Sequence, residues 1–218
     1  MLGPNELAEA ARLLRAGECV AFPTETVYGL GANALDAKAV EAIFVAKGRP
    51  QDNPLIVHCA SEVQVRELVE EIPLDAVKLM ERFWPGPLTL VLPRSSRIPP
   101  VVSAGLETLA VRIPSHPLAL ELIERAELPL AAPSANLSGR PSPTTAQHVY
   151  TDLKGRIAAV VDGGETGWGV ESTVVDCTSQ PFRLLRPGGV TLEELNSICH
   201  VQVDPGVYGG LEPGIQPR

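Results

Sequence analysis

Residues 18–31 read ECVAFPTETVYGLG, an apolar run followed directly by a long polar segment. The run ECVAF (18–22) is typical of a buried strand because it is short, apolar and followed by proline. Residues 23–31 then contain more hydroxyl groups and glycines than a simple turn needs. Because binding residues often lie in loops at the ends of strands, we expect this segment to be a loop that contributes to a site.

Helices and strands alternate along the first part of the chain, and strands follow one another more closely in the second part. We expect helices at 5–16 (capped by Asn5), 36–47 (capped by Asp36), 62–70, 74–83, 117–126, 144–151 and from 191 onward, where T-x-x-E forms a capping box. We expect strands at 18–22, 55–59, 88–92, 109–113, 130–132, 157–161, 172–176 and 182–185. This order favours a single α/β domain over residues 1–200 with a mixed parallel and antiparallel sheet. Residues 201–218 are rich in glycine and proline and indicate a tail or the start of a linker.

Composition excludes several classes of protein. Apolar residues make up 44% of the 218, which is typical of a globular chain. The net charge of −8 argues against broad nonspecific binding to nucleic acid, which needs a basic surface. The amino terminus lacks the pattern of a signal peptide, no apolar run is long enough to cross a membrane, and the four cysteines lack C-x-x-C spacing. We therefore expect a cytoplasmic protein with reduced thiols. The four scattered histidines give no support for a metal site built from side chains.

Two segments place cations where an anion could bind. In KGRPQDNPLIVH (47–58), either Lys47 or Arg49 alone would be explained by the dipole at the end of a helix. Together they bring a point charge and a planar fork close to each other, as a triphosphate requires. In TLAVRIPSHP (108–117), Arg112 interrupts an apolar strand, and burying it is costly unless it is paired or faces a cavity. Arg112 is thus either an outward-facing residue on a half-exposed sheet or a clamp for a carboxylate or phosphate.

Two further segments are rich in small and hydroxyl residues. AAPSANLSGRPSPTT (131–145) is either a surface loop or a segment that lets the backbone approach a ligand. DGGETGWGVESTVVD (162–176), followed by LLRPGG (184–189) with Arg186, matches neither of the common glycine-rich nucleotide motifs. There is no evident Ser-His-Asp order or cysteine nucleophile. From the residues alone we expect a small-molecule enzyme or binding protein for an anionic ligand, which binds and stabilises charge by positioning.

These segments also occur in one known order. PTETVYGLG, KGRPQDNPLIVH, FWPGPLTLVL, VRIPSHP, APSANLSGRPSPT, ESTVVD and LLRPGG resemble the YrdC-like family, in particular its threonylcarbamoyl-adenylate synthases. The resemblance covers roughly residues 5 to 200. Its hallmark is a K-x-R and S-x-N pair, here Lys47 with Arg49 and Ser134 with Asn136.

The resemblance implies a twisted open α/β sheet with a large, concave, basic cavity. It implies a nucleotidyltransferase that joins L-threonine, bicarbonate (or CO2) and ATP into L-threonylcarbamoyl-adenylate and releases pyrophosphate, with Mg²⁺ bound through the phosphates and not by protein side chains. A tRNA threonylcarbamoyl transferase complex then modifies adenosine 37 of tRNAs that read codons beginning with A. This chain itself would bind tRNA weakly or not at all and would bind no membrane.

The resemblance also assigns roles to residues. It implies that threonine is surrounded by Thr26, His58, Arg112, Ala132 and Ser172, with Arg112 as the fork for its carboxylate. It implies that ATP is contacted by Lys47, Arg49, Asn53, Thr108, Ser134, Asn136, Ser142 and Arg186. Lys47 and Arg49 would also be catalytic, because negative charge grows on the phosphates in the transition state.

Two rival functions stay open at this point. A carbamoyl-phosphate-dependent domain of the same fold would form a carbamoyl-adenylate, although the zinc-finger neighbours of such domains have no counterpart here. A noncatalytic double-stranded RNA-binding module is the other, and the acidic net charge argues against it. The residues near the C-terminus, 212–218, resemble the start of the linker to a second domain in longer members. The chain is therefore either a short form with a tail or a longer protein cut in that linker.

Overall fold

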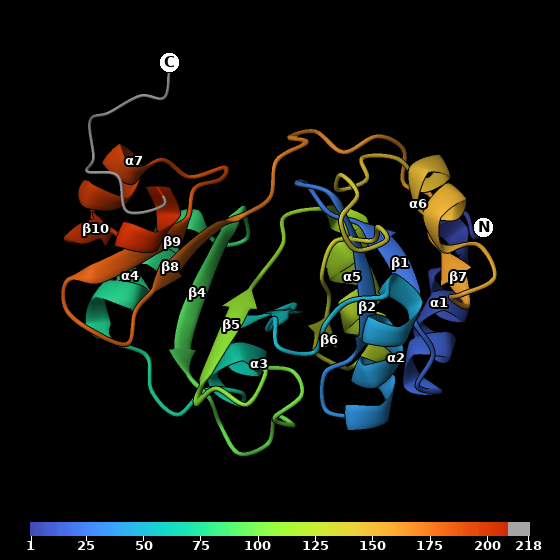
Figure 1. Cartoon of the computed structure of the whole chain (residues 1–218), viewed down its shortest axis with the longest axis horizontal. Coiled ribbons are helices and arrows are strands. Elements are labelled where there is room, and N and C mark those ends of the chain that lie inside the picture. The colour runs from blue at the N-terminus through green and yellow to red at the C-terminus, as the bar shows by residue number, and fades with distance from the viewer. Residues whose placement is uncertain (209–218) are drawn as a thin grey trace.

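The computed structural model describes residues 1–208 and contains one mixed sheet (Figure 1). The strands are β1 (Val20–Pro23), β2 (Tyr28–Asn33), β3 (Ile56–His58), β4 (Leu88–Pro93), β5 (Thr108–Arg112), β6 (Leu130–Ala131), β7 (Ala159–Val160), β8 (Thr173–Asp176), β9 (Phe182–Arg186) and β10 (Val201–Val203). They lie in the order β10-β9-β8-β4-β5-β3-β6-β2-β1-β7. Parallel and antiparallel pairs both occur, so the predicted α/β fold with a mixed sheet is confirmed.

The helices are α1 (Leu7–Arg15), α2 (Ala37–Lys47), α3 (Glu62–Arg66), α4 (Leu74–Phe83), α5 (Pro117–Ala126), α6 (Ala146–Leu153) and α7 (Leu192–Asn196), with 3₁₀ turns η1 (Pro4–Glu6) and η2 (Pro205–Tyr208). Several begin and end at predicted signals. Asp36 accepts a hydrogen bond from the Lys38 amide at the start of α2, and Gly48 ends that helix with φ of 61°. The prediction that Asn5 caps the first helix is wrong, because Asn5 lies inside η1 and α1 follows directly from that turn.

The opening segment forms a β-hairpin, so the prediction that residues 23–31 are entirely a loop is wrong. β1 and β2 pair antiparallel with Phe22 opposite Gly29, and residues 24–27 connect them. A Cβ atom on Gly31 would lie 2.7 Å from Cε1 of Phe22. Gly31 therefore leaves room for the Phe22 ring beside the hairpin backbone.

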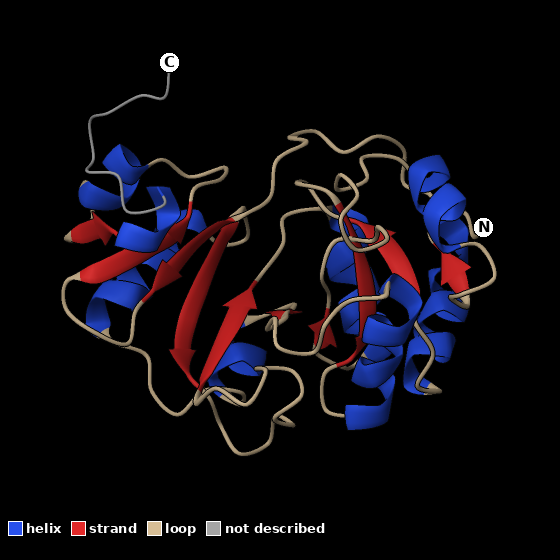
Figure 2. Ribbon diagram, viewed as in Figure 1, coloured by secondary structure: helices blue, strands red, loops and turns tan. Residues whose placement is uncertain are grey.

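Two hydrophobic clusters cover the sheet unequally. Around β1 and β2, helices α1 and α5 pack on one face, and α2 and α6 contribute to the cluster on the other. Around β4, β5, β8 and β9, helices α3, α4 and α7 contribute to the same larger cluster, and Figure 2 shows them behind these strands. The opposite face of these strands is open, and a long segment from β7 to β8 crosses above it between the two halves of the sheet (Figure 1).

The sheet continues beyond residue 200, where the domain was predicted to end. β10 pairs parallel with β9, with Val201 opposite Phe182. The later part of the predicted tail, 209–218, lies outside the described residues. Within residues 1–208, no helix combines the length and apolar character that crossing a membrane would need. The four cysteines are free thiols, and three of them are buried.

Candidate functional site

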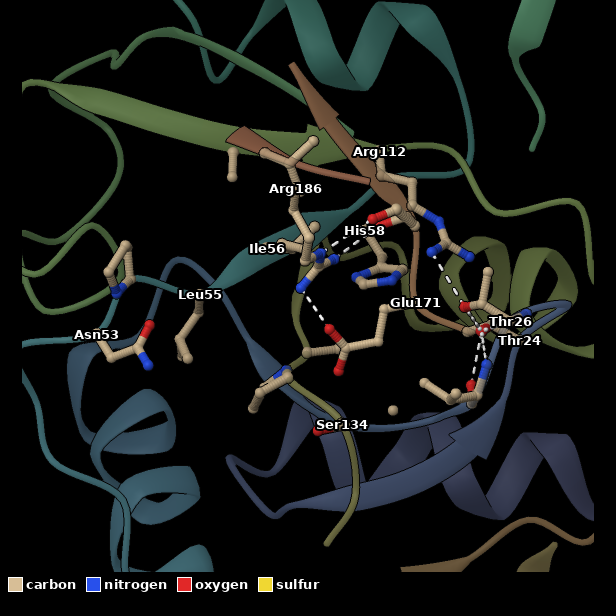
Figure 3. Close-up of a pocket in the computed structure, with 18 of the residues that line it drawn as sticks. Thr24, Thr26, Asn53, Leu55, Ile56, His58, Arg112, Ser134, Glu171 and Arg186 are labelled. Carbon is tan, nitrogen blue, oxygen red and sulfur yellow. Dashed lines mark hydrogen bonds and ion pairs between the residues drawn. The ribbon is translucent and has the colours of Figure 1, made fainter. Parts of the chain in front are cut away.

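A cavity of about 420 Å³ opens on the uncovered face of the sheet (Figure 3). Its floor comes from alternate residues of neighbouring strands, including Ile56 and His58 of β3 and Ala110 and Arg112 of β5. Strand alternation explains this arrangement, because every second side chain points to the same face. The volume is in the range of small-molecule sites. The cavity therefore lies where the sheet lacks a covering helix.

All five residues expected around threonine line this cavity. They are Thr26, His58, Arg112, Ala132 and Ser172. They come from the β1–β2 turn, β3, β5, the end of β6 and the residue before β8, and the sheet order brings these distant segments together. Of the residues expected to contact ATP, four line the same cavity: Arg49, Asn53, Ser134 and Arg186.

Arg112 is held by the turn between β1 and β2. Its Nη2 lies 2.9 Å from Oε2 of Glu25, and its Nη1 donates a hydrogen bond of 3.2 Å to Oγ1 of Thr26. Thr26 in turn shares a hydrogen bond of 2.9 Å with Thr24. Burial lowers the pKa of Arg112, and the Glu25 carboxylate acts in the opposite direction. Arg112 is thus a paired, buried cation at the edge of a cavity, and the outward-facing alternative does not apply.

His58 lies directly beside Arg112 in the paired strands and is almost fully buried. Burial lowers the pKa of its imidazole to about 3, and the neighbouring Arg112 charge adds to that effect. The ring meets Phe22 edge-on, with 6.2 Å between the ring centroids. His58 therefore contributes a neutral imidazole to the cavity at physiological pH.

Lys47 connects the two halves of the K-x-R and S-x-N pair. It is 2% exposed, does not line the cavity, and donates hydrogen bonds to the backbone oxygens of Ser134 and Asn136. Burial, and then the nearby Arg49 charge, lower its pKa to about 8. The side chain of Asn136 is also turned inward, and its Nδ2 donates to the oxygens of Leu137 and Arg140 at 2.8 and 2.7 Å. Both residues hold the 134–140 segment in shape in this structure.

Two other residues expected at ATP also lie outside the cavity lining. Thr108 begins β5 on the same face as Ala110 and Arg112, but the cavity does not extend to it. Ser142 donates a hydrogen bond of 3.0 Å to Oε1 of Glu171. The structure thus brings nine of the thirteen expected residues to one cavity, and Lys47, Thr108, Asn136 and Ser142 do not line it.

Glu171 is the functional candidate that the sequence reasoning missed. It lines the cavity, and its Oε2 lies 2.5 Å from Nη1 of Arg186. Arg186 also donates to the backbone oxygen of Ser172 at 3.0 Å and to its hydroxyl at 3.1 Å. The available signal was its position directly before Ser172 in ESTVVD, but an acidic residue was not expected in a site for anions.

The remaining cation in the lining is not neutralised in this way. Arg49 forms no ion pair with a carboxylate within residues 1–208, and its nearest acceptor is the Pro54 oxygen, 3.5 Å from Nη2. Burial lowers its pKa, and the Glu171 charge partly offsets that effect. Arg49 is therefore the guanidinium with most capacity left for an incoming anion.

Comparison with known proteins finds similar chains over most of this sequence. A chain from Pyrococcus abyssi named threonylcarbamoyl-AMP synthase is 60% identical over 201 residues, which cover 92% of this chain and 59% of that one. A protein of the same name from Bacillus subtilis is 57% identical over 214 residues, covering 97% of this chain and 62% of the relative. The chain thus spans about 60% of the length of these relatives.

A solved structure gives the same result in three dimensions. The crystal structure of P. abyssi Sua5 complexed with L-threonine superposes with a TM-score of 0.93 at 56% identity, over 95% of this chain and 63% of that chain. The model of the Sua5/YciO/YrdC family, described as "Telomere recombination", matches residues 12–188. The chain therefore belongs to the Sua5/YciO/YrdC family.

Proposed function

We propose that this chain is the catalytic part of an L-threonylcarbamoyladenylate synthase. The observation that carries the proposal is that residues expected at threonine and residues expected at ATP line one cavity. The relatives named threonylcarbamoyl-AMP synthase, at 57% and 60% identity, support the same reaction. The Sua5 structure complexed with L-threonine supports threonine as one substrate.

The threonine end of the cavity is proposed to lie at Arg112. A guanidinium fork suits a carboxylate, and Nε of Arg112 has no hydrogen-bond partner within residues 1–208. The neutral imidazole of His58 lies next to it and adds no charge that would repel the ammonium group of the amino acid. Thr26, Ala132 and Ser172 complete this end with small and hydroxyl-bearing residues.

The ATP end is proposed to lie at Arg49 and Arg186, with Asn53 and Ser134 beside them. The deprotonated threonine amine attacks CO2 to give a carbamate, and a carbamate oxygen then attacks the α-phosphorus of ATP. The bond from that phosphorus to the bridging oxygen breaks, and pyrophosphate leaves with the bonding electrons. Arg49 and Arg186 stabilise the charge that grows on the phosphate oxygens.

Lys47 is proposed to act through the segment it holds. Its contacts to the oxygens of Ser134 and Asn136 fix the loop that carries the Ser134 hydroxyl beside the nucleotide, and its charge lies behind that loop. Asn136, Ser142 and Thr108 remain proposed nucleotide contacts. Asn136 and Thr108 would reach ATP only if it extends beyond the cavity described above, whereas Ser142 already contacts Glu171 of the cavity lining.

Magnesium is proposed to arrive as part of the nucleotide substrate. Within residues 1–208 no group of three or more acidic, histidine or cysteine side chains could hold a metal ion. Glu171, the one acidic side chain described in the cavity lining, is engaged with Arg186 and Ser142. On the phosphates the ion would neutralise the leaving pyrophosphate.

The product is proposed to pass to a tRNA threonylcarbamoyl transferase complex in the cytoplasm, which modifies adenosine 37 of tRNAs reading codons that begin with A. An acyl-adenylate is a mixed anhydride and reacts readily with a nucleophile, so the step that consumes it must be a group transfer. The net charge of −8 argues against firm binding of tRNA by this chain itself.

A pyrophosphate-release assay tests the proposal. The chain is mixed with ATP and magnesium, and threonine, bicarbonate and carbamoyl phosphate are supplied singly and in combination. We expect release only when threonine and bicarbonate are both present. Release that depends on carbamoyl phosphate would instead indicate a carbamoyl-adenylate-forming domain, and no turnover together with tight binding of double-stranded RNA would indicate a binding module.

A further inference from the structure

Glu171 places a negative charge inside a cavity that otherwise carries guanidinium groups. Among the described residues that line the cavity, Arg49, Arg112 and Arg186 are cationic and Glu171 is the one carboxylate. Figure 3 shows its side chain extending from the segment before β8 toward Arg186. A carboxylate in a site for a polyanion would repel its ligand unless it moves or serves another purpose.

Both oxygens of this carboxylate are bound to groups proposed to contact ATP. Oε2 lies 2.5 Å from Nη1 of Arg186, and Oε1 accepts a hydrogen bond of 3.0 Å from the Ser142 hydroxyl. Arg186 and Ser142 are far apart in sequence and belong to different segments, β9 and the loop before α6. Glu171 therefore makes the contacts that two phosphate oxygens could make in its place.

The charge of Glu171 acts on the whole cationic cluster. Burial lowers the pKa of Lys47, Arg49, Arg112 and Arg186, and for each of them the Glu171 carboxylate acts in the opposite direction. The carboxylate thus compensates several cations of the cavity at once. The charge of Arg112 is also compensated by Glu25. Arg186 forms no ion pair with a second carboxylate within the described residues.

The ion pair between Glu171 and Arg186 is exposed enough for another anion to reach it. The side chains of Glu171 and Arg186 are each 36% exposed, in contrast to 3% for Arg112 and 10% for Glu25. Ion pairs reached by water contribute little net free energy, so another anion can replace one partner at small cost. The Glu25–Arg112 pair is thus the buried one of the two, and the Glu171–Arg186 pair is the one that solvent reaches.

We propose that Glu171 is an internal counter-ion that holds Arg186 and Ser142 in place until the triphosphate of ATP displaces it. This inference rests on the proposed function, because it takes the displacing ligand to be a nucleotide. When ATP binds, its phosphate oxygens take over the contacts of Oε1 and Oε2, and the carboxylate turns into solvent. Glu171 competes with the nucleotide and lowers its affinity, while it keeps the empty site charge-balanced.

Isothermal titration of the Glu171→Gln variant tests this competition. Glutamine keeps the shape of the side chain but removes its charge, so the loop can retain its hydrogen bonds. Glu165→Gln is the matched control, because Glu165 lies in the same segment, is exposed and does not line the cavity. The titrants are ATP with magnesium, tripolyphosphate without any metal, and L-threonine, and the thermal midpoint of each variant confirms that it is folded.

We expect Glu171→Gln to bind both ATP and tripolyphosphate about two- to fivefold more tightly than the wild type, the range that loss of an exposed ion pair allows. Glu165→Gln should match the wild type, and threonine affinity should be unchanged in both variants. Equal or weaker tripolyphosphate binding by Glu171→Gln would overturn the inference. Weaker binding confined to ATP with magnesium would also overturn it and would indicate a metal ligand. If the wild type binds neither ATP nor tripolyphosphate, the proposed function itself fails.

Discussion

The buried pair of Glu25 and Arg112 gives the largest stability effect that we predict. Arg112 is 3% exposed and Glu25 is 10% exposed, with 2.9 Å between the charged atoms. Glu25→Gln removes one charge and leaves the other buried. Removal of one partner of a buried ion pair typically lowers the free energy of unfolding by about 3–5 kcal/mol. For a chain of this size each kcal/mol shifts the thermal midpoint by about 2–4 °C, so we expect a fall of at least about 6 °C.

Urea unfolding followed by circular dichroism measures this effect. Glu165→Gln replaces an exposed carboxylate by a carboxamide and is the control. Its free energy of unfolding should lie within about 0.5 kcal/mol of that of the wild type. The double variant Glu25→Gln/Arg112→Met removes both charges and should be more stable than Glu25→Gln alone, because no unpaired charge remains buried. A Glu25→Gln variant as stable as the control, or a double variant less stable than Glu25→Gln, would refute this reasoning.

Three further predictions concern residues of the site and its hairpin. His58 has a pKa of about 3 in the folded chain, against 6.5 for the free side chain, so the unfolded chain binds its proton more tightly and stability is lost as pH falls below 6.5. Between pH 6.5 and pH 5 this loss is about 1.5 kcal/mol. The free energy of unfolding of the wild type, measured by urea titration, should fall by this amount over that pH range, and that of His58→Gln should lack this part of the fall. Gly31→Ala places Cβ 2.7 Å from a buried ring and should lower the free energy of unfolding by about 1–3 kcal/mol, whereas Gly167→Ala, with open space around it, should be neutral; equal urea midpoints would contradict this. In steady-state kinetics, Arg112→Lys should raise the KM for threonine about tenfold with little change in kcat, and Arg49→Lys should mainly lower kcat; equal increases in that KM would argue against the division of roles.

Local signals predicted much of the fold. The helix after Asp36 ends at Gly48, and the helices at 74–83 and 117–126 have the predicted bounds, because caps, prolines and apolar spacing act within a few residues. The Thr191–Glu194 capping box is present as well. Residue patterns alone predicted a mixed sheet but not the order of its strands. The family resemblance implied, in addition, that this sheet is twisted and open.

The elements that were missed depend on distant partners. β2 has a glycine-containing sequence typical of a loop, and it is a strand because it pairs with β1 and also with the distant β6, where Ala131 lies opposite Ala32. β10 is a strand of only three residues, VQV, and it is held by parallel pairing with β9. Neither fact can be read from the residues of the segment itself.

The same limit applies to the site. Sequence motifs identified most of the cavity lining, since the strands that carry them meet at one face of the sheet. They could not tell which way Lys47 turns, because its acceptors are backbone oxygens of residues 134 and 136, far along the chain. They also gave no reason to expect Glu171, whose importance depends on its contacts with Arg186 and Ser142.

Identification of the product tests the proposed synthase reaction most directly. The chain is incubated with ATP, magnesium, L-threonine and ¹³C-labelled bicarbonate, and the mixture is analysed by mass spectrometry. We expect threonylcarbamoyl-adenylate with the label in its carbamoyl carbon, formed together with pyrophosphate. ATP turnover without this adenylate, or an adenylate that lacks the label, would contradict it.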